Sequence, residues 1–357
     1  MKINSYQEVD IQEKIQVWNK WWQGALGRPV FHVELAYGSR QYMPKFPCYP
    51  AETPIGKIAA EHKKHLETLR FAADGYPRVW MDFGPGCLAT MVGGSGSAEG
   101  TDTVWFGPGS FKDKPLEEYS LRFDPDSEWA RKIADTINTF ADALGNNVIL
   151  GTTDIGGVLD VIASLRDPQT LLLDLYDNPD EVKRLVAEEG RAFRDCYTFF
   201  DNVLSRHQNA RSCWGALLST GTNYMLQSDF AYMISPEMFK EFVAPELARQ
   251  SEFIEHPCYH LDGAGQIPHV PYLAATPNLQ CIQWVPGDGM PPQCEWPELL
   301  EQIEAANLKF QLFGSVDTVR KSLRMLKKPE NAHVLIWENS PQMMPKIEAL
   351  LAEFGAA

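Results

Sequence analysis

The sequence has no long apolar run and no basic tract, and each absence argues against a class of protein. No apolar stretch approaches the roughly 18 residues that a membrane-spanning helix needs, so neither membrane insertion nor secretion is expected. The formal net charge is −15, from 47 acidic and 32 basic residues. No basic segment offsets this charge, which disfavours a nucleic-acid partner or an anionic membrane surface.

Paired cysteines and a complete phosphate-binding loop are also missing. The seven cysteines are odd in number, widely spaced and free of any C-x-x-C pair, a pattern typical of free thiols in a reducing cytoplasm. The glycine-rich run at 93–97 lacks the Lys-Ser/Thr that a P-loop requires. We interpret this run as a flexible loop and the protein as cytoplasmic.

Strand-like runs alternate with helical segments along most of the 357 residues. Such alternation predicts an α/β protein with a parallel sheet, and eight units fit a single closed (β/α)8 TIM barrel spanning 1–357. A helical extension at 1–27 precedes the first strand, and an inserted excursion at 84–126 follows the second. The eight runs begin near residues 31, 78, 148, 213, 258, 279, 308 and 333.

Polar residues gather where these predicted strands end, and five of them are carboxylates. In such barrels the active site lies at the carboxyl-terminal mouth, so we expect these residues to converge. Carboxylates packed closely are costly unless a cation offsets them, which favours a bound metal or a positively charged substrate. The residues are Glu34, Asp82, Asp154, His260, Asp262, Gln283, Ser315 and Glu338.

The run 257–263 is the strongest candidate for the centre of a site. Alternation along a strand places Cys258, His260 and Asp262 on one face. We expect Cys258 to pack inside the barrel and His260, Asp262 and Glu338 to hold a metal with a fourth position open, as catalytic zinc requires. The alternative is that His260 and Asp262 only satisfy each other as a buried polar pair.

Other candidate residues surround this predicted metal site. Asp154, Tyr224 and Asp82 are candidates for catalysis, by positioning substrate or relaying protons. The candidates for substrate binding include tryptophans near strand ends, which could wall an apolar pocket or face a methylated cation, or simply pack the barrel. They are Glu34, Trp80, Trp284, Gln283 and Trp337.

Several segments occur in an order that resembles a known family. They are Arg28-Pro29-Val30-Phe31, the arm at 38–44, Leu173-Asp174-Leu175 running to Pro179, Asp229 with Ile234-Ser235-Pro236-Glu237, Pro245-Glu246-Leu247, His260-Leu261-Asp262-Gly263, and Phe313-Gly314-Ser315-Val316-Asp317. Together they resemble the uroporphyrinogen decarboxylase superfamily, which also contains cobalamin-dependent methyltransferases.

Two departures from the family patterns distinguish between its branches. Glu34 stands where the decarboxylases carry the first arginine of their substrate arm, and an acid there would repel a polycarboxylate. In the methyltransferases' H-x-C-G motif, Asp262 replaces the cysteine, and Glu338 falls about where the second zinc-binding cysteine would lie. Carboxylates in place of thiolates would give a harder zinc, suited to polarising an oxygen.

The resemblance implies a methyltransferase that moves a methyl group from a small O- or N-methylated compound to a corrinoid (cobalamin) protein. Zinc would be held by His260, Asp262 and Glu338, and the chain would form a homodimer. One alternative is a decarboxylase or lyase that grips a small acid with Arg28, Arg40 or Arg78. Another is a non-catalytic member that binds a small ligand or a corrinoid protein.

Overall fold

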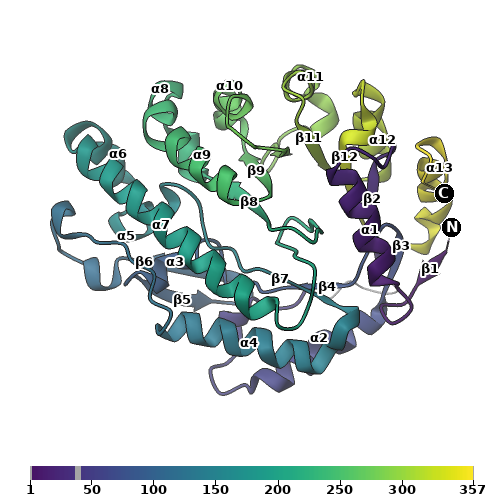
Figure 1. The fold of residues 1–357 in the computed structure, drawn as a ribbon, viewed down its shortest axis with the longest axis horizontal. Helices are drawn as coiled ribbons and strands as arrows, with labels where there is room; N and C mark the ends of the chain where they lie inside the picture. Colours follow the sequence, from purple (N-terminus) through teal and green to yellow (C-terminus); the bar gives the residue numbers. More distant parts are fainter. Residues whose placement is uncertain (1, 37–41, 357) are drawn as a thin grey trace.

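The structure, a computed structural model, describes residues 2–36 and 42–356 and has a mixed α/β fold. An eight-stranded sheet has the order β1-β3-β2-β12-β11-β10-β9-β8, and Figure 1 shows most of the helices outside the arc of strands. The strands from β8 round to β2 run parallel. These strands are β2 (Val30–Ala36), β8 (Asn223–Gln227), β9 (His256–Asp262), β10 (Cys281–Val285), β11 (Lys309–Phe313) and β12 (Ala332–Glu338).

Two smaller sheets accompany the large one. The strands β4 (Arg78–Trp80) and β7 (Ile149–Gly151) form a parallel pair, and β5 (Ser95–Glu99) and β6 (Thr103–Gly107) form an antiparallel hairpin. Within the described residues, ladder hydrogen bonds do not join the β4–β7 pair to the large sheet as a closed cylinder. The alternating α/β pattern is therefore confirmed. The strands do not form one continuous hydrogen-bonded barrel in the part of the chain that the structure describes.

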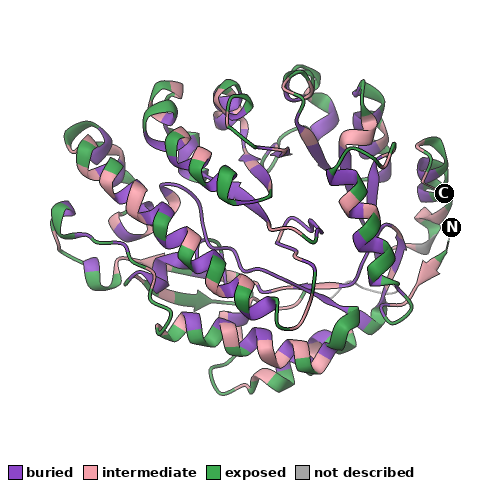
Figure 2. Cartoon of the chain, in the orientation of Figure 1, coloured by how far each residue is buried: buried purple, intermediate pink, exposed green. Residues whose placement is uncertain are grey.

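The helices pack an apolar face onto the strands and leave a polar face outward, as the burial colours of Figure 2 show. None of them, within 2–36 and 42–356, is long and apolar enough to cross a bilayer. They are α1 (Ile11–Trp22), α2 (Ile55–Thr68), α3 (Leu88–Met91), α4 (Glu128–Leu144), α5 (Asp160–Arg166), α6 (Pro168–Asp177), α7 (Pro179–Leu204), α8 (Pro236–Met238), α9 (Ala244–Phe253), α10 (Val270–Ala274), α11 (Pro297–Ala305), α12 (Val316–Met325) and α13 (Met344–Glu353).

The amino-terminal helix α1 packs near the start of β12. Asp10 caps it by accepting a hydrogen bond from the Glu13 amide, as expected for an aspartate at this position. Its Trp18 lies edge-on to His333, with 4.5 Å between ring centroids. This contact joins α1 to the beginning of a central strand.

Two predicted elements are wrong. The run at 212–217 is not a strand: Arg211 and Ser219 pair with each other, and Ala216 has a left-handed φ of 54°, so this loop turns back before β8 begins. The helix predicted to reach residue 73 ends at Thr68, and β3 (Leu69–Ala73) follows, antiparallel to β2. In both places a buried apolar run has a local pattern that does not reveal its partner.

Other expectations concern side chains and segments. All seven cysteines are free, and Cys258 is fully buried. The glycine-rich run at 93–97 is not simply a loop, because β5 begins at Ser95. Arg40 and most of the predicted arm at 38–44 lie outside the described residues.

Candidate metal centre

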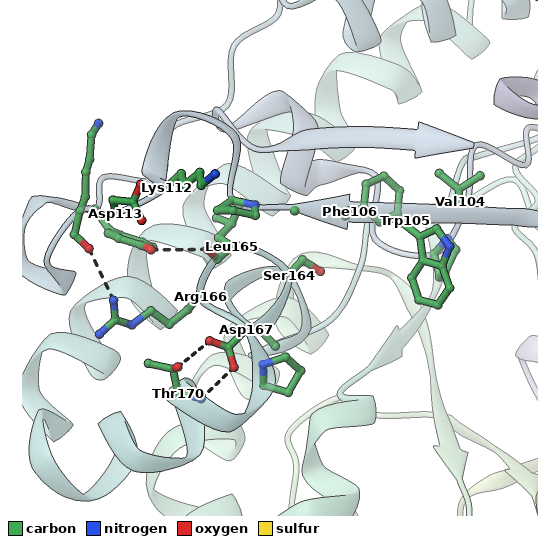
Figure 3. A pocket seen from close by; sticks show the side chains of 17 residues that line it. Val104, Trp105, Phe106, Lys112, Asp113, Ser164, Leu165, Arg166, Asp167 and Thr170 are labelled. Atoms are coloured by element: carbon green, nitrogen blue, oxygen red, sulfur yellow. Dashed lines mark hydrogen bonds between the residues drawn. The ribbon is translucent and has the colours of Figure 1, made fainter. Parts of the chain in front are cut away.

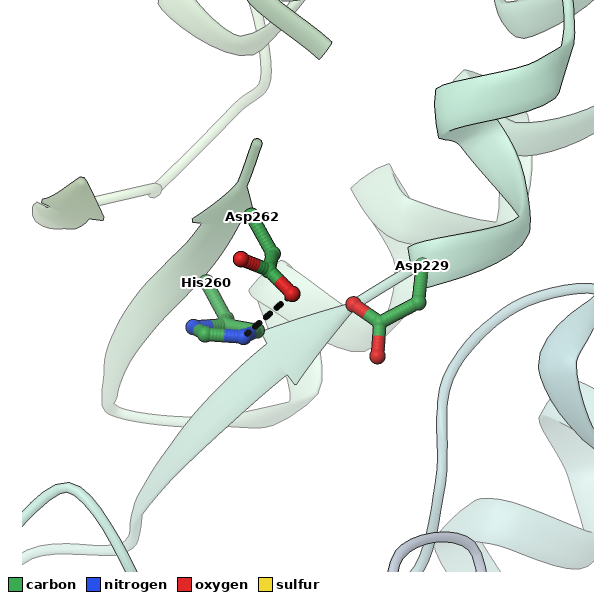
Figure 4. A group of neighbouring side chains, drawn as sticks. All are labelled: Asp229, His260 and Asp262. Carbon is green, nitrogen blue, oxygen red and sulfur yellow. Dashed lines mark ion pairs between the residues drawn. The ribbon is translucent and has the colours of Figure 1, made fainter. Parts of the chain in front are cut away.

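Three side chains that can bind a metal meet where two neighbouring parallel strands end. His260 and Asp262 close β9, and Asp229 follows β8 by two residues. Each of the three offers a ligand atom within 4.8 Å of the others', and His260 Nε2 lies 3.9 Å from Asp262 Oδ2. Figure 4 shows Asp229 reaching toward this pair from the neighbouring segment. Parallel pairing of Gln227 with His260 brings these strand ends together.

The surroundings of His260 suit a metal ligand. Its Nδ1 lies 2.5 Å from Gln283 Oε1, a contact that leaves Nε2 for the two carboxylates. Metal-binding histidines are commonly held by such a hydrogen bond on the other ring nitrogen. Trp214 packs edge-on to the imidazole, with 4.8 Å between centroids. One imidazole and two carboxylates form a donor set that fits zinc or another borderline-to-hard divalent ion.

The surroundings of Asp229 disfavour the charged form of its carboxyl group. Its side chain reaches solvent, yet the surrounding protein desolvates the carboxylate and raises its pKa. His260 opposes this shift in pKa, and the neighbouring charge of Asp262 adds to it. A bound cation would remove the repulsion between the two acids.

The structure does not bring Glu338 into this group, contrary to our expectation. Glu338 ends β12, three strands away from β9 in the sheet. His333 on the same strand contacts the interior residue Gln311, so alternation places Glu338 on the opposite face. Asp229 stands in the third position instead. It belongs to a segment that carried the family resemblance, and that was the available signal.

A second acidic centre forms around Asp154, which is 5% exposed. Its Oδ1 accepts hydrogen bonds from the Gly156 amide at 3.0 Å, Gln227 Nε2 at 3.1 Å and the Tyr224 hydroxyl at 3.4 Å. Burial raises the pKa of Asp154 to about 7, and the charge of Asp229 adds to the shift. The two predicted catalytic residues Asp154 and Tyr224 are thus neighbours, and Gln227, which we had not assigned, links them to the β8–β9 strand ends.

Asp82 stands apart with a counter-ion of its own. Its Oδ2 lies 3.2 Å from Lys45 Nζ, and its Oδ1 accepts from the Gly84 amide at 3.1 Å. Desolvation raises the pKa of Asp82, and Lys45 opposes the rise. The positive charge of Lys45 therefore already offsets the negative charge of Asp82.

The predicted substrate-binding residues are divided among different surroundings. Gln283 faces His260, but the next residue, Trp284, points to the helix layer and packs on Trp296 at 5.3 Å, so the structure does not place Trp284 in the site. Glu34 and Trp80 line a separate cavity of about 150 Å³. Trp337, near the end of β12, is 44% exposed.

Cavities approach the metal centre from two sides. A cavity of about 340 Å³ is lined by Asp229 and Gln227, and one of about 620 Å³ is lined by Asp262. The former shares wall residues with a third cavity of about 740 Å³ under the β5–β6 hairpin, where Trp105 and Arg166 lie (Figure 3). Asp229 and Asp262 therefore each line a different cavity.

Comparison with known proteins defines the fold. No family model matches the chain, and no curated protein sequence matches it. A methyltransferase from Methanosarcina mazei superposes with a TM-score of 0.62 at 13% identity, over 96% of this chain and 99% of that one. An aldolase/citrate lyase family protein from Burkholderia cenocepacia gives 0.32 at 11% identity, over 95% and 98%, a score that supports no argument. The chain thus shares its fold with a methyltransferase from Methanosarcina mazei.

Proposed function

We propose that the protein is a metal-dependent methyltransferase that takes a methyl group from a small O- or N-methylated compound and passes it to a corrinoid on a partner protein. The observation that carries this proposal is the Asp229–His260–Asp262 group at the strand ends. The shared fold with a methyltransferase supports it. In this proposal the β4–β7 pair completes a (β/α)8 barrel, whose mouth is the usual place for such a site.

The proposed metal would be zinc, held by Asp229, His260 and Asp262. When bound, it would act as a Lewis acid on the oxygen or nitrogen that carries the methyl group. The protein's own residues hold this site in place: Gln283 fixes the His260 ring through Nδ1, and Trp214 packs against the ring.

Asp154 is the proposed proton donor. Because its pKa is raised to about 7, about half of these carboxyl groups carry a proton at pH 7, and the protonated form can protonate the heteroatom that loses the methyl group. Tyr224 and Gln227 orient the carboxyl through Oδ1. The other oxygen of Asp154 is then the one that carries the proton.

The two cavities beside the centre suit two reactants. We assign the methyl donor to the cavity of about 340 Å³ that Asp229 lines, because it is the smaller of the two and its volume is sufficient for a small molecule. The corrinoid would approach through the cavity of about 620 Å³ beside Asp262. A corrinoid protein and a second copy of this chain are the proposed macromolecular partners.

The alternative of a decarboxylase or lyase loses support at Arg28. This guanidinium is already committed to Asp74, with nitrogen–oxygen distances of 2.6 and 2.9 Å. Arg78 lines the separate cavity with Glu34, where an acid would oppose a carboxylate substrate.

Metal content tests the proposal directly. We expect the purified protein to bind about one zinc ion per chain by elemental analysis, because one group of three metal ligands is found within the described residues. Asp229→Asn and His260→Asn are expected to lose it, because each removes a ligand atom. Glu338→Gln is the matched control, since Glu338 lies outside the group.

Methyl transfer is then measured with cob(I)alamin as acceptor and a panel of methylated alcohols, amines and aryl ethers as donors. Formation of methylcobalamin is followed by its visible spectrum. A metal-free wild-type protein that stays so in excess zinc, or Asp229→Asn protein with full zinc content, would contradict the metal assignment.

A further inference from the structure

A chain of hydrogen-bonded side chains crosses four strands beneath the metal centre. His260, Gln283, Gln311 and His333 stand opposite one another in the registers of β9, β10, β11 and β12. Gln283 Nε2 donates to Gln311 Oε1, and Gln311 Nε2 lies 2.9 Å from His333 Nδ1. With the 2.5 Å contact between His260 and Gln283, the four side chains form one continuous row.

A backbone carbonyl sets the direction of this row. Gln311 Nε2 also lies 2.5 Å from the carbonyl oxygen of Gly215, and a carbonyl oxygen can only accept. The amide nitrogen of Gln311 must therefore face Gly215, so its Oε1 faces Gln283. Gln283 in turn donates through its nitrogen and presents Oε1 to His260, whose Nδ1 must then carry the hydrogen.

We propose that Gln311 and Gln283, oriented by the Gly215 carbonyl, are positioning residues that hold His260 in the tautomer protonated on Nδ1. This inference rests on the proposed metal function, because that tautomer leaves the Nε2 lone pair free beside Asp229 and Asp262. The amide oxygen of Gln283 thereby accepts the hydrogen bond that a metal-binding histidine usually donates to a carboxylate or a backbone carbonyl.

His333 ends the row as a neutral acceptor. It is fully buried, and its Nε2 has no hydrogen-bond partner among the residues that the structure describes. Burial and the nearby charge of Arg78 lower its pKa to about 3, so Nδ1 accepts from Gln311 over the working pH range. If His333 were protonated, its Nδ1–H and the side-chain N–H of Gln311 would be two donors facing each other.

One loop anchors both the row and the imidazole. Gly215 lies in the turn between Arg211 and Ser219, whose backbones are hydrogen-bonded to each other, and the adjacent Trp214 packs on the His260 ring. This loop thus orients the ring directly through Trp214 and sets its tautomer through Gly215. Both contacts come from the buried loop where we had predicted a strand.

The first test reads the tautomer in metal-free protein. Long-range ¹H–¹⁵N correlation spectra distinguish Nδ1–H from Nε2–H histidine, and His260→Asn identifies the signal. We expect a single Nδ1–H form in the wild type and its loss in Gln311→Met, together with zinc binding weakened by about 10- to 100-fold. A wild-type His260 protonated on Nε2 overturns the proposal by itself.

Gln208→Met is the control for general loss of side-chain hydrogen bonds, at a residue that is partly buried. The Gln208 amide makes three hydrogen bonds to the backbone of Leu150 and Ala210, as many as the side chain of Gln311 makes. We expect the control to keep the His260 tautomer and zinc affinity. Equal effects of Gln208→Met and Gln311→Met would overturn the proposal.

A rescue experiment separates orientation from structure. A carboxylate at residue 283 can only accept, so Gln283→Glu holds Nδ1–H without help from Gln311. We expect the double variant Gln283→Glu/Gln311→Met to regain the Nδ1–H form and zinc affinity within a few-fold of wild type. Absence of rescue in a folded double variant overturns the proposal. An Nδ1–H tautomer in a protein that binds no zinc would overturn the metal function alone.

Discussion

Asp154 shows how its surroundings can raise the pKa of a single side chain. Three hydrogen bonds donated to Oδ1 favour its ionised form, yet burial outweighs them and raises the pKa to about 7. The folded protein therefore loses stability when this carboxyl group ionises. Raised pKa values of this kind cluster at functional sites.

The variant Asp154→Asn should reveal that cost as a function of pH. An unfolded aspartate titrates near pH 3.9, so between about pH 4 and pH 7 only the unfolded state releases its proton, and stability falls as the pH rises. At about 1.4 kcal/mol per unit, the penalty reaches as much as about 4 kcal/mol above pH 7. Asparagine keeps the acceptor oxygen and removes the titration.

We therefore expect Asp154→Asn to match the wild type near pH 4 and to exceed it in free energy of unfolding at pH 8. Urea unfolding of the metal-free proteins at the two pH values measures this difference. If the variant and the wild type differed in free energy of unfolding by the same amount at both pH values, Asp154 would not titrate as described.

The connection after β3 holds two elements together, the strand β2 and the helix α1. Asp74 accepts hydrogen bonds from the Phe31 amide on β2 and from Arg28, and its carbonyl accepts from Trp18 of α1. The following residue, Gly75, packs directly on β2. A Cβ atom at Gly75 would lie 2.6 Å from the Val33 carbonyl oxygen.

Gly75→Ala is expected to destabilise the protein by about 1–3 kcal/mol, because the backbone of β2 has to shift to admit the methyl group. Gly56→Ala is the matched comparison: it lies in α2 with nothing within 4 Å of the added atom. There alanine should be neutral or stabilise by up to about 1 kcal/mol. Denaturant unfolding of both variants checks the contrast, and equal stabilities would refute the close-packing argument.

A metal at the proposed centre would add a link between two segments of the molecule that the β8–β9 pairing and the hydrogen bond from His269 to the Ala231 carbonyl already join. Asp229 comes from the segment after β8, while His260 and Asp262 belong to β9. A ligand that binds only the folded state stabilises it by mass action, by about 4 kcal/mol at a thousand times its dissociation constant. The net charge of −15 also favours cation binding in general.

We expect excess zinc to raise the melting temperature of the metal-free protein by several degrees, as such a free-energy gain implies for a domain this large. Asp229→Asn protein should respond much less, which separates the site from general charge screening. Differential scanning calorimetry with zinc, and with magnesium as a comparison ion, measures the effect. A zinc response that is unchanged in Asp229→Asn would count against the centre.

The sequence by itself determined the features that depend on near neighbours in the chain. Alternation along 258–262 placed His260 and Asp262 on one face, and they do meet. The alternation of strands and helices predicted an α/β fold. Both predictions follow from side-chain periodicity, which needs no knowledge of distant partners.

Only the tertiary structure decided which distant segments meet. Local pattern favoured the buried run at 212–217 as a strand, but Asn223–Gln227 takes that place and carries Asp229 to the centre. Glu338 ends a strand as expected, yet register and facing keep it away from His260. Strand register and facing depend on the packing of the whole sheet, because a one-residue shift moves every side chain to the other face.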